Sequence, residues 1–112
     1  MQNPKFQIFK SSANQQYYFR LKAKNGENIL SGEGYTSKKS CLNGIQSVKT
    51  NSPYDSRYED RKSVNGQYYF NLKASNGEII GTSEMYTTSS ARDNGKAAVK
   101  RDAPGAGIED LT

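Results

Sequence analysis

The stretch that decides the fold is YYFRLKAKNGE at residues 17–27, which returns as YYFNLKASNGE at residues 68–78. Extended to residues 17–53 against residues 68–104, the two segments share 18 identities in 37 positions without a gap. Self-similarity at one fixed offset is the signature of an internal duplication. The sequence therefore predicts two tandem repeats, the first over residues 4–56 and the second over residues 57–112.

Strand periodicity dominates the first half of each repeat. Apolar and polar residues alternate over residues 17–24 and 68–75, which predicts two strands that each have one apolar face. A preceding strand is expected over residues 6–9. The alternation returns at residues 108–112, which predicts a last short strand.

The hairpin signal Asn25-Gly26 fixes which face each strand presents, because a slip of one residue would exchange the two faces. A two-residue loop would place Ile29 opposite Lys22 on the charged face. We therefore expect a three-residue loop with Gly26 in the left-handed conformation and Ile29 opposite Leu21. The same argument around Gly77 sets Ile80 opposite Leu72.

The hydrophobic period then becomes helical in both repeats. The expected N-caps and terminating prolines are Thr36 or Ser37 with Pro53, and Thr87 or Thr88 with Pro104. Gly44 and Gly95 fall in mid-helix, at a cost of about 1 kcal/mol each against Ala, which close packing on the sheet would explain. Lys96 stands where the first helix has Ile45, so the second helix is expected to have the thinner packing face.

Each repeat is too small and too polar to hold a core of its own, at roughly 50 residues. We therefore expect an α+β fold in which two β3-α-β repeats form one antiparallel sheet, with both helices on one face and the other face open to water. A strand after each helix would pair into the opposite repeat, so that the C-terminal strands are exchanged. Residues 1–112 would then form a single pseudo-symmetric domain, and the chain would be a monomer that acts as an internal pseudo-dimer.

Composition excludes several kinds of site. The chain has no histidine and one cysteine, so Ser-His-Asp and Cys-His catalytic arrangements and His-containing zinc sites are impossible. Cys41 lies on the apolar stripe of the first helix and is expected to act as a small hydrophobe. We predict no catalytic residue, no metal site and no cofactor. No stretch has the length of a membrane span, and a cytoplasmic location is expected.

The duplicated segments carry a recognisable signature. The run YYFxLKAxNGE is followed by Gly-Glu-x-Tyr or Ser-Glu-x-Tyr, and then by a helix that holds Asn-Gly and ends Val-Lys-x-x-x-Pro. This pattern resembles the YegP-like family of small bacterial proteins in its tandem-duplicated form, over nearly the whole chain. The resemblance implies tandem β3-α-β units in one sheet with exchanged C-terminal strands, and single-unit relatives that reach the same arrangement as dimers. It implies no biochemical role.

The net charge of +5 comes entirely from the first repeat, because residues 1–56 hold 8 Lys and Arg with 3 acids, whereas residues 57–112 hold 8 of each. On the open sheet face this charge would lie beside aromatic rings, which is the form of a single-strand nucleic-acid platform. The possible binding face consists of Tyr18, Arg20, Lys22, Tyr69 and Lys73. We favour the alternative that these residues form a solvated sheet face, since Tyr and Lys are common cross-strand neighbours.

Two further pairs of repeated residues receive structural interpretations. Glu33 and Glu84, which alternate with the tyrosines before each helix, are expected to accept hydrogen bonds from helix N-terminal amides or from a tyrosine hydroxyl. Asn43 and Asn94 are expected to tie each helix to a strand. The sequence thus predicts a small non-enzymatic binding or accessory protein whose partner is unknown, with a protein that contacts a sheet edge or the open face as one possible partner. Weak binding of single-stranded nucleic acid is the alternative.

Overall fold

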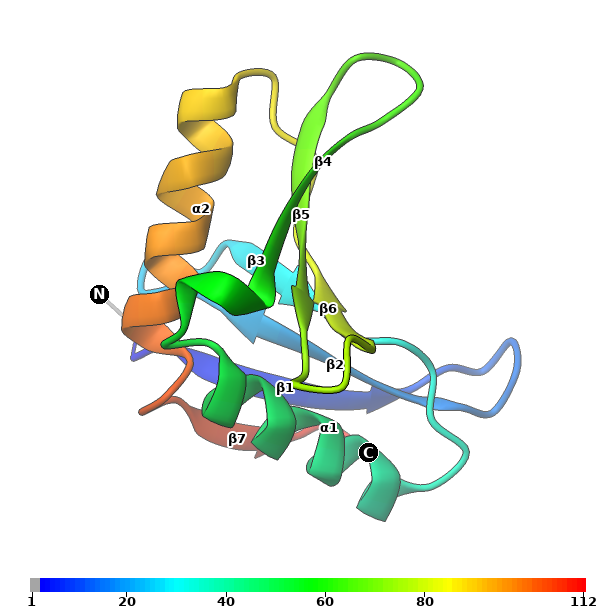
Figure 1. Cartoon of the computed structure of the whole chain (residues 1–112). Coiled ribbons are helices and arrows are strands. Elements are labelled where there is room, and N and C mark those ends of the chain that lie inside the picture. The colour runs from blue at the N-terminus through cyan, green and yellow to red at the C-terminus, as the bar shows by residue number, and fades with distance from the viewer. Residues whose placement is uncertain (1–2) are drawn as a thin grey trace.

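The computed structural model describes residues 3–112, so Met1 and Gln2 fall outside the description. These residues form two helices and a seven-stranded sheet with the order β4-β5-β6-β3-β2-β1-β7 (Figure 1). The first repeat contains β1 (Lys5–Lys10), β2 (Tyr17–Lys22), β3 (Asn28–Ser31) and α1 (Lys38–Asn51). The 3-10 helix η1 (Asp55–Arg57) spans the boundary between the repeats, and the second repeat contains β4 (Tyr58–Lys62), β5 (Tyr68–Lys73), β6 (Ile79–Thr82), α2 (Ser89–Asp102) and β7 (Gly107–Asp110). The α+β class and the repeated β-β-β-α units are confirmed.

The two repeats meet at β3 and β6, in the middle of the sheet. One antiparallel pair, Ser31 opposite Thr82, joins these strands. The two residues occupy equivalent positions of the repeats, so the pseudo-two-fold axis passes between them. The junction is narrow, and Figure 1 shows β4 and β5 running across the direction of β1 and β2.

The hydrophobic core is shared between the repeats, as the small size of each repeat predicts. Helix α1 packs against β5 and β6 as well as its own β2, and α2 packs against β3 as well as β5. The large side chains that are fully buried come from both repeats and include Phe6, Phe19, Leu21, Ile45, Phe70 and Leu72. Both repeats therefore contribute to one common core.

The first hairpin has the predicted three-residue loop but not the predicted strand register. The Ala23 N–H donates to the Glu27 carbonyl at 2.9 Å, and Gly26 has a φ of +84°. Beyond the loop a β-bulge shifts the pairing, so that Leu21 lies opposite Leu30 instead of Ile29. The bulge gives both Ile29 and Leu30 access to the core, where 5% and 0% of their surfaces remain exposed. The second hairpin repeats this correction, since Gly81, not Ile80, pairs with Leu72.

The helix termini follow the sequence prediction. Ser37 and Thr88 are the N-caps, and their hydroxyls accept the N–H groups of Ser40 and Ala91 at 3.1 and 3.0 Å. A Cβ on Gly44 would overlap the Tyr35 ring, and one on Gly95 would overlap the Tyr86 ring. The mid-helix glycines therefore permit close packing. Helix α2 buries fewer residues than α1, which confirms its thinner packing face.

The exchange of C-terminal strands occurs once, and its direction differs from the expectation. Strand β7 leaves the second repeat and pairs with β1 of the first, but in parallel, so the sheet is not wholly antiparallel. No strand of residues 3–112 separates α1 from β4, because only η1 and the short link around it lie between them. That link is too short to form a strand and return, so the chain enters β4 directly. Neither helix is long and apolar enough to cross a membrane.

Candidate functional site: the outer edge of β4 and its surroundings

The residues of the predicted binding face on β2 already have partners within the protein. The ring of Tyr18 stacks on Phe9 with centroids 5.8 Å apart. The Arg20 guanidinium lies 4.7 Å from the Phe9 centroid, and its Nε donates to Gln7 Oε1 at 2.8 Å. Lys22 Nζ lies 3.5 Å from the Gly26 carbonyl oxygen. These contacts hold the aromatic and cationic groups against the sheet.

The residues of the predicted face on β5 form a separate group. Lys73 Nζ donates to Glu59 of β4 at 2.8 Å, and Tyr69 lies opposite Arg61 of β4. Two strands, β6 and β3, lie between β5 and β2, a separation of about 14 Å along the sheet at the usual strand spacing. The structure therefore does not bring Tyr18 and Tyr69 into one patch.

The outer edge of β4 differs from the equivalent edge of β1. On β1, the Ile8 carbonyl oxygen accepts the Leu111 N–H at 2.8 Å, so this edge is covered by the β7 segment. Asp60 lies opposite Phe70 as Ile8 lies opposite Phe19, and its carbonyl oxygen therefore points to the outer side of β4. Because β4 ends the sheet, no strand of residues 3–112 covers that side.

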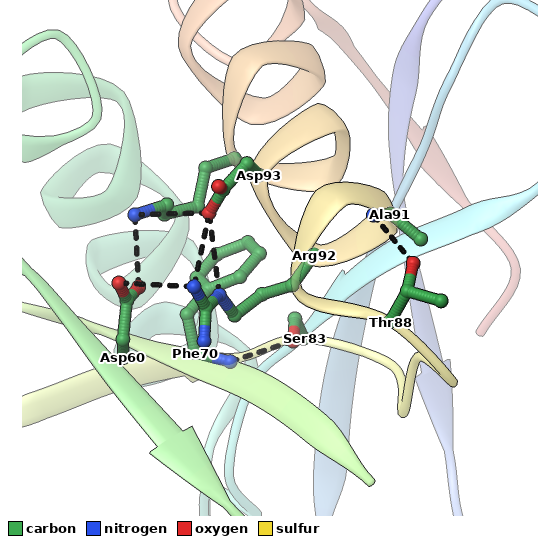
Figure 2. Close-up of polar contacts among 8 residues, drawn as sticks. Asp60, Phe70, Ser83, Thr88, Ala91, Arg92 and Asp93 are labelled. Carbon is green, nitrogen blue, oxygen red and sulfur yellow. Dashed lines mark hydrogen bonds and ion pairs between the residues drawn. The ribbon is translucent and has the colours of Figure 1, made fainter.

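Four charged residues of β4 and α2 form an ion cluster beside this edge, namely Asp60, Arg92, Asp93 and Lys96. Figure 2 shows Asp60 of β4 facing Arg92 and Asp93 of α2. Asp60 accepts a hydrogen bond from Lys96 Nζ at 2.8 Å and lies 3.5 Å from the Arg92 guanidinium. Arg92 also contacts Asp93 at 3.2 Å. The Arg92 and Lys96 side chains are 14% and 22% exposed, so they run along the protein surface before their charged ends meet the carboxylates.

The ion cluster replaces apolar packing that the first repeat retains. The positions equivalent to Asp60, Arg92 and Lys96 hold Ile8, Cys41 and Ile45, all of them buried. The change from apolar to charged residues follows the covering of the two edges. Strand β1, with apolar residues at these positions, is covered by β7, and the charged strand β4 is not. Charged side chains on an uncovered edge strand oppose indiscriminate pairing with other strands.

Glu59 adds a second set of ion pairs on the other face of β4. Its carboxylate contacts Lys73 Nζ and the Arg61 guanidinium, each at 2.8 Å. Hydrogen bonds from Lys73 and then Arg61 hold the pKa of Glu59 below its usual range. Both faces of β4 are thus charged, while the outward main-chain groups of the strand stay accessible.

The predicted roles of the repeated carboxylates and amides are wrong. Glu33, Glu84, Asn43 and Asn94 are exposed, and their side chains make no hydrogen bond within residues 3–112. The helix N-terminal amides that Glu33 and Glu84 were expected to bind are capped by the hydroxyls of the residues before each helix. The short hydroxyl side chains cap the helices in preference to the glutamates because they lose less conformational freedom.

Cys41 is fully buried, as predicted from its place on the apolar stripe. Burial raises the pKa of its thiol to about 11, so the thiol stays protonated at neutral pH and is a poor nucleophile. Within residues 3–112 no group of three or more Cys, Asp and Glu side chains converges as metal ligands would. Among the described residues, the outer edge of β4 offers main-chain groups that no neighbouring strand pairs.

A family model described as "Domain of unknown function (DUF1508)" matches the chain twice, over residues 12–59 and 63–110. The UPF0339 protein YegP of Escherichia coli strain K12 is 50% identical over 107 residues, which cover 96% of each chain. The solution NMR structure of a UPF0339 protein from Shewanella oneidensis has a TM-score of 0.91 at 49% identity and covers 98% of this chain and 92% of that one. The solution NMR structure of yegP from E. coli, titled a protein of unknown function, has a TM-score of 0.91 at 47% identity and covers 100% and 96%. The chain therefore belongs to the YegP-like DUF1508 family, in its tandem form, for which no biochemical role is established.

Proposed function

We propose that this protein is a non-enzymatic interaction module that binds an extended segment of a protein partner along the outer edge of β4. The observation that carries the proposal is the inequality of two equivalent edges: β7 covers β1, and no strand of residues 3–112 covers β4. Addition of a strand to an uncovered edge is a recurring mode of peptide recognition.

The β1–β7 pairing shows that this fold accepts a parallel strand at the equivalent edge. There, four residue pairs run from Lys5 opposite Gly107 to Ile8 opposite Asp110. On β4 the equivalent outward-facing main-chain groups belong to Tyr58, Asp60 and Lys62. A partner segment that hydrogen-bonds these groups would extend the sheet by one strand.

The side chains of β4 would select the partner. The sequence Glu59-Asp60-Arg61-Lys62 carries two acids followed by two bases, and an uncharged or wrongly charged strand would desolvate these groups without compensation. Main-chain hydrogen bonds supply affinity in this mode of recognition, and the flanking side chains supply specificity. The uncovered edge of β4 therefore favours a partner segment whose charges complement these four residues over indiscriminate strand pairing.

The proposal also includes a monomeric state, which rests on the shared core, and a cytoplasmic location, which rests on the buried thiol. The two repeats share their core, which favours a monomer that needs no second copy. The buried, unpaired Cys41 is compatible with a reducing cytoplasm. The proposed protein contact is favoured over single-stranded nucleic acid, because the cations and rings of the predicted face already have internal partners.

A proline at Lys62 tests the proposal, because it removes an outward-facing N–H at a place where an edge strand tolerates proline. The matched control is Lys62→Ala, which removes the same side chain and keeps the N–H. Proteins captured from a native extract by the wild type and by K62A, but not by K62P, are the expected partners.

The captured partner is then purified and added to the labelled wild-type protein. We expect hydrogen exchange of the Asp60 and Lys62 amides to slow, since these groups would enter a strand ladder. Equal capture by K62P and K62A, or unchanged exchange on β4 with a bound partner, would show that the edge is not the binding site.

A further inference from the structure

A cleft of about 480 Å³ lies between the β2–β3 hairpin of the first repeat and α2 of the second. Its volume is in the range of small-molecule sites, about 300–1,000 Å³. The cleft is separate from the edge of β4. It is lined by Ala23, Lys24, Asn25, Glu27 and Ile29 from the hairpin, and by Tyr86, Ala91, Asn94, Gly95, Ala98 and Arg101 from the second repeat.

The floor of the cleft is formed by small apolar residues of α2. Ala91, Gly95 and Ala98 recur at helical spacing on α2 and leave room above the helix backbone. Ile29 and Ala23 close the opposite wall and are 5% and 6% exposed. An apolar body bound between these walls would be removed from water on two sides.

The rim of the cleft holds hydrogen-bond donors that have no internal use. The Lys24 ammonium, the Asn94 amide and the Tyr86 hydroxyl make no hydrogen bond or ion pair within residues 3–112. Asn25 uses only its Oδ1, which accepts the Glu27 N–H at 3.0 Å, so its amide N–H groups remain available. This distinguishes the cleft from the open sheet face, where the cationic side chains are paired.

Arg101 adds a second cation to the rim. Its Nε and one terminal nitrogen bind the buried Asp102 carboxylate at 2.8 and 2.9 Å, which fixes the guanidinium in place and leaves other N–H groups free. Glu27 is the one acid among the lining residues. Burial, followed by the charges of Glu84 and Glu27, raises the pKa of Tyr86, so its hydroxyl remains a donor at neutral pH. An anion at the rim would meet the Lys24 ammonium, unpaired among the described residues, and the hydrogen-bond donors of Asn25 and Asn94.

The comparison of the two repeats shows that these features occur together at α2 only. The positions equivalent to Lys24 and Arg101 hold Ser75 and Thr50, neither of them charged. The positions equivalent to Ala91 and Ala98 hold Ser40 and Ser47. Both the cations and the apolar floor are therefore absent from the equivalent place beside α1.

We propose that this cleft binds a small organic carboxylate with a short apolar body. The carboxylate lies at the rim, where the Lys24 ammonium and the amide groups of Asn25 and Asn94 can donate to it. The apolar body lies on the floor against Ala98 and Ile29.

Hexanoate is the probe that we choose, with acetate and hexanol as matched ligands that each lack one of the two features. Each is titrated into the full-length, isotope-labelled protein at constant ionic strength, and amide NMR shifts are followed. Hexanoate should give saturable shifts confined to residues 24–29 and to the exposed face of α2. Acetate and hexanol should each bind about tenfold more weakly. Equal binding of hexanol and hexanoate, or shifts spread over the whole sheet, would overturn the proposal.

Two variants test the contacts. Lys24→Ser introduces the residue that the second repeat already carries at this hairpin position, and we expect it to weaken hexanoate binding roughly two- to fivefold. The control Lys39→Ser removes the same charge from an exposed position outside the cleft, where the second repeat carries Ser90, and should leave binding unchanged. Ala98→Leu fills the floor and should abolish the saturable shifts. An equal effect of K24S and K39S, or full binding by a folded A98L variant, would contradict the assignment.

Discussion

Leu30 of β3 lies over Gly81 of β6, with its Cδ2 2.8 Å from the place that a Cβ of residue 81 would occupy. The two residues hold equivalent positions of the two repeats, next to the Ser31–Thr82 pair through which the pseudo-two-fold axis passes. Exact symmetry would bring two leucines into collision here or leave two glycines facing a void. The duplicated chain avoids both outcomes, because it can place a large residue on one side and none on the other.

The Leu30–Gly81 contact predicts a compensating pair of substitutions. Gly81→Leu should lower the free energy of unfolding by about 1–3 kcal/mol, because the added side chain overpacks the junction. The double variant L30G/G81L restores one large and one absent side chain, and should recover at least half of that loss. Urea denaturation of the wild type, both single variants and the double variant measures the coupling. Strictly additive effects would show that the two positions do not share one space.

Removal of β7 should make the protein aggregate. Deletion of residues 107–112 would expose the outer edge of β1, an apolar strand with both Phe6 and Ile8 fully buried in the intact protein. We expect light scattering to rise with protein concentration for the deletion variant. Glu109→Gln with Asp110→Asn is the control, since it keeps the strand and amide oxygens that can still accept from Gln7 and Thr112, while the ion pairs with Lys5 and Lys38 are lost. Aggregation of the control would point to charge rather than to edge coverage.

The contribution of the ion cluster beside β4 to stability should depend on all of its charged residues together. Asp60→Ile alone leaves Arg92 and Lys96 with only the exposed carboxylate of Asp93, and should lower the free energy of unfolding by about 1 kcal/mol. The triple variant D60I/R92C/K96I copies the apolar packing of the first repeat, and should be as stable as the wild type or more stable. Its stability should also vary less with NaCl between low and high salt. Urea titrations at two salt concentrations would disprove this if the triple variant were the least stable.

Stability should fall at alkaline pH because of Cys41. Burial raises the pKa of this thiol to about 11 in the folded protein, whereas its ordinary pKa is about 9. Above pH 9 the unfolded chain therefore loses a proton that the folded chain keeps. The contribution of Cys41 to the free energy of unfolding is thus fully present below pH 9 and declines as the pH rises towards 11. Urea denaturation at several pH values from 8 to 10 measures the slope. Cys41→Ala should flatten it, and an equally steep slope in that variant would assign the effect to another group.

The shared core predicts that the repeats fold only together. The full chain should elute as a monomer of 12.4 kDa in size-exclusion chromatography with light scattering. The separate fragments 1–56 and 57–112 should show little structure alone, since each exposes half of the common core. Their mixture should regain the helical circular dichroism of the intact chain. Independent cooperative unfolding of either fragment would contradict the shared core.

Much of the fold could be predicted from local patterns. Alternation placed β2 and β5, the Asn-Gly pairs placed the hairpin loops, and hydroxyl residues and prolines bounded both helices. The register of the first hairpin could not be predicted in full, because the bulge that pairs Leu21 with Leu30 is set by packing in the core and leaves no local turn signal. The parallel direction of β7 was missed for a similar reason, since direction depends on where the preceding helix ends in space.

The candidate site was less accessible to sequence reasoning than the fold. Outward alternation identified Tyr18, Arg20 and Lys22, but it could not show that Phe9, Gln7 and a loop carbonyl already engage them. The ion cluster had a visible signal, because Arg92 and Lys96 replace Cys41 and Ile45. The third replacement, Asp60 at the position equivalent to Ile8, lies on a separate strand. Only the pairing of β4 with β5 brings Asp60 beside Arg92 and Lys96 of α2.

The amino-acid sequence alone established the duplication, from the match of residues 17–53 with residues 68–104, and the strand and helix periods, which depend on neighbours close in the chain. Its composition excluded the chemistries that need histidine. The tertiary structure decided which edge stays open, which cations remain unpaired and where a cleft forms. These properties arise between segments such as β7 and β1, or the β2–β3 hairpin and α2, that lie far apart in the sequence. They depend on the space left when two unequal repeats pack around one core, and no local pattern encodes that space.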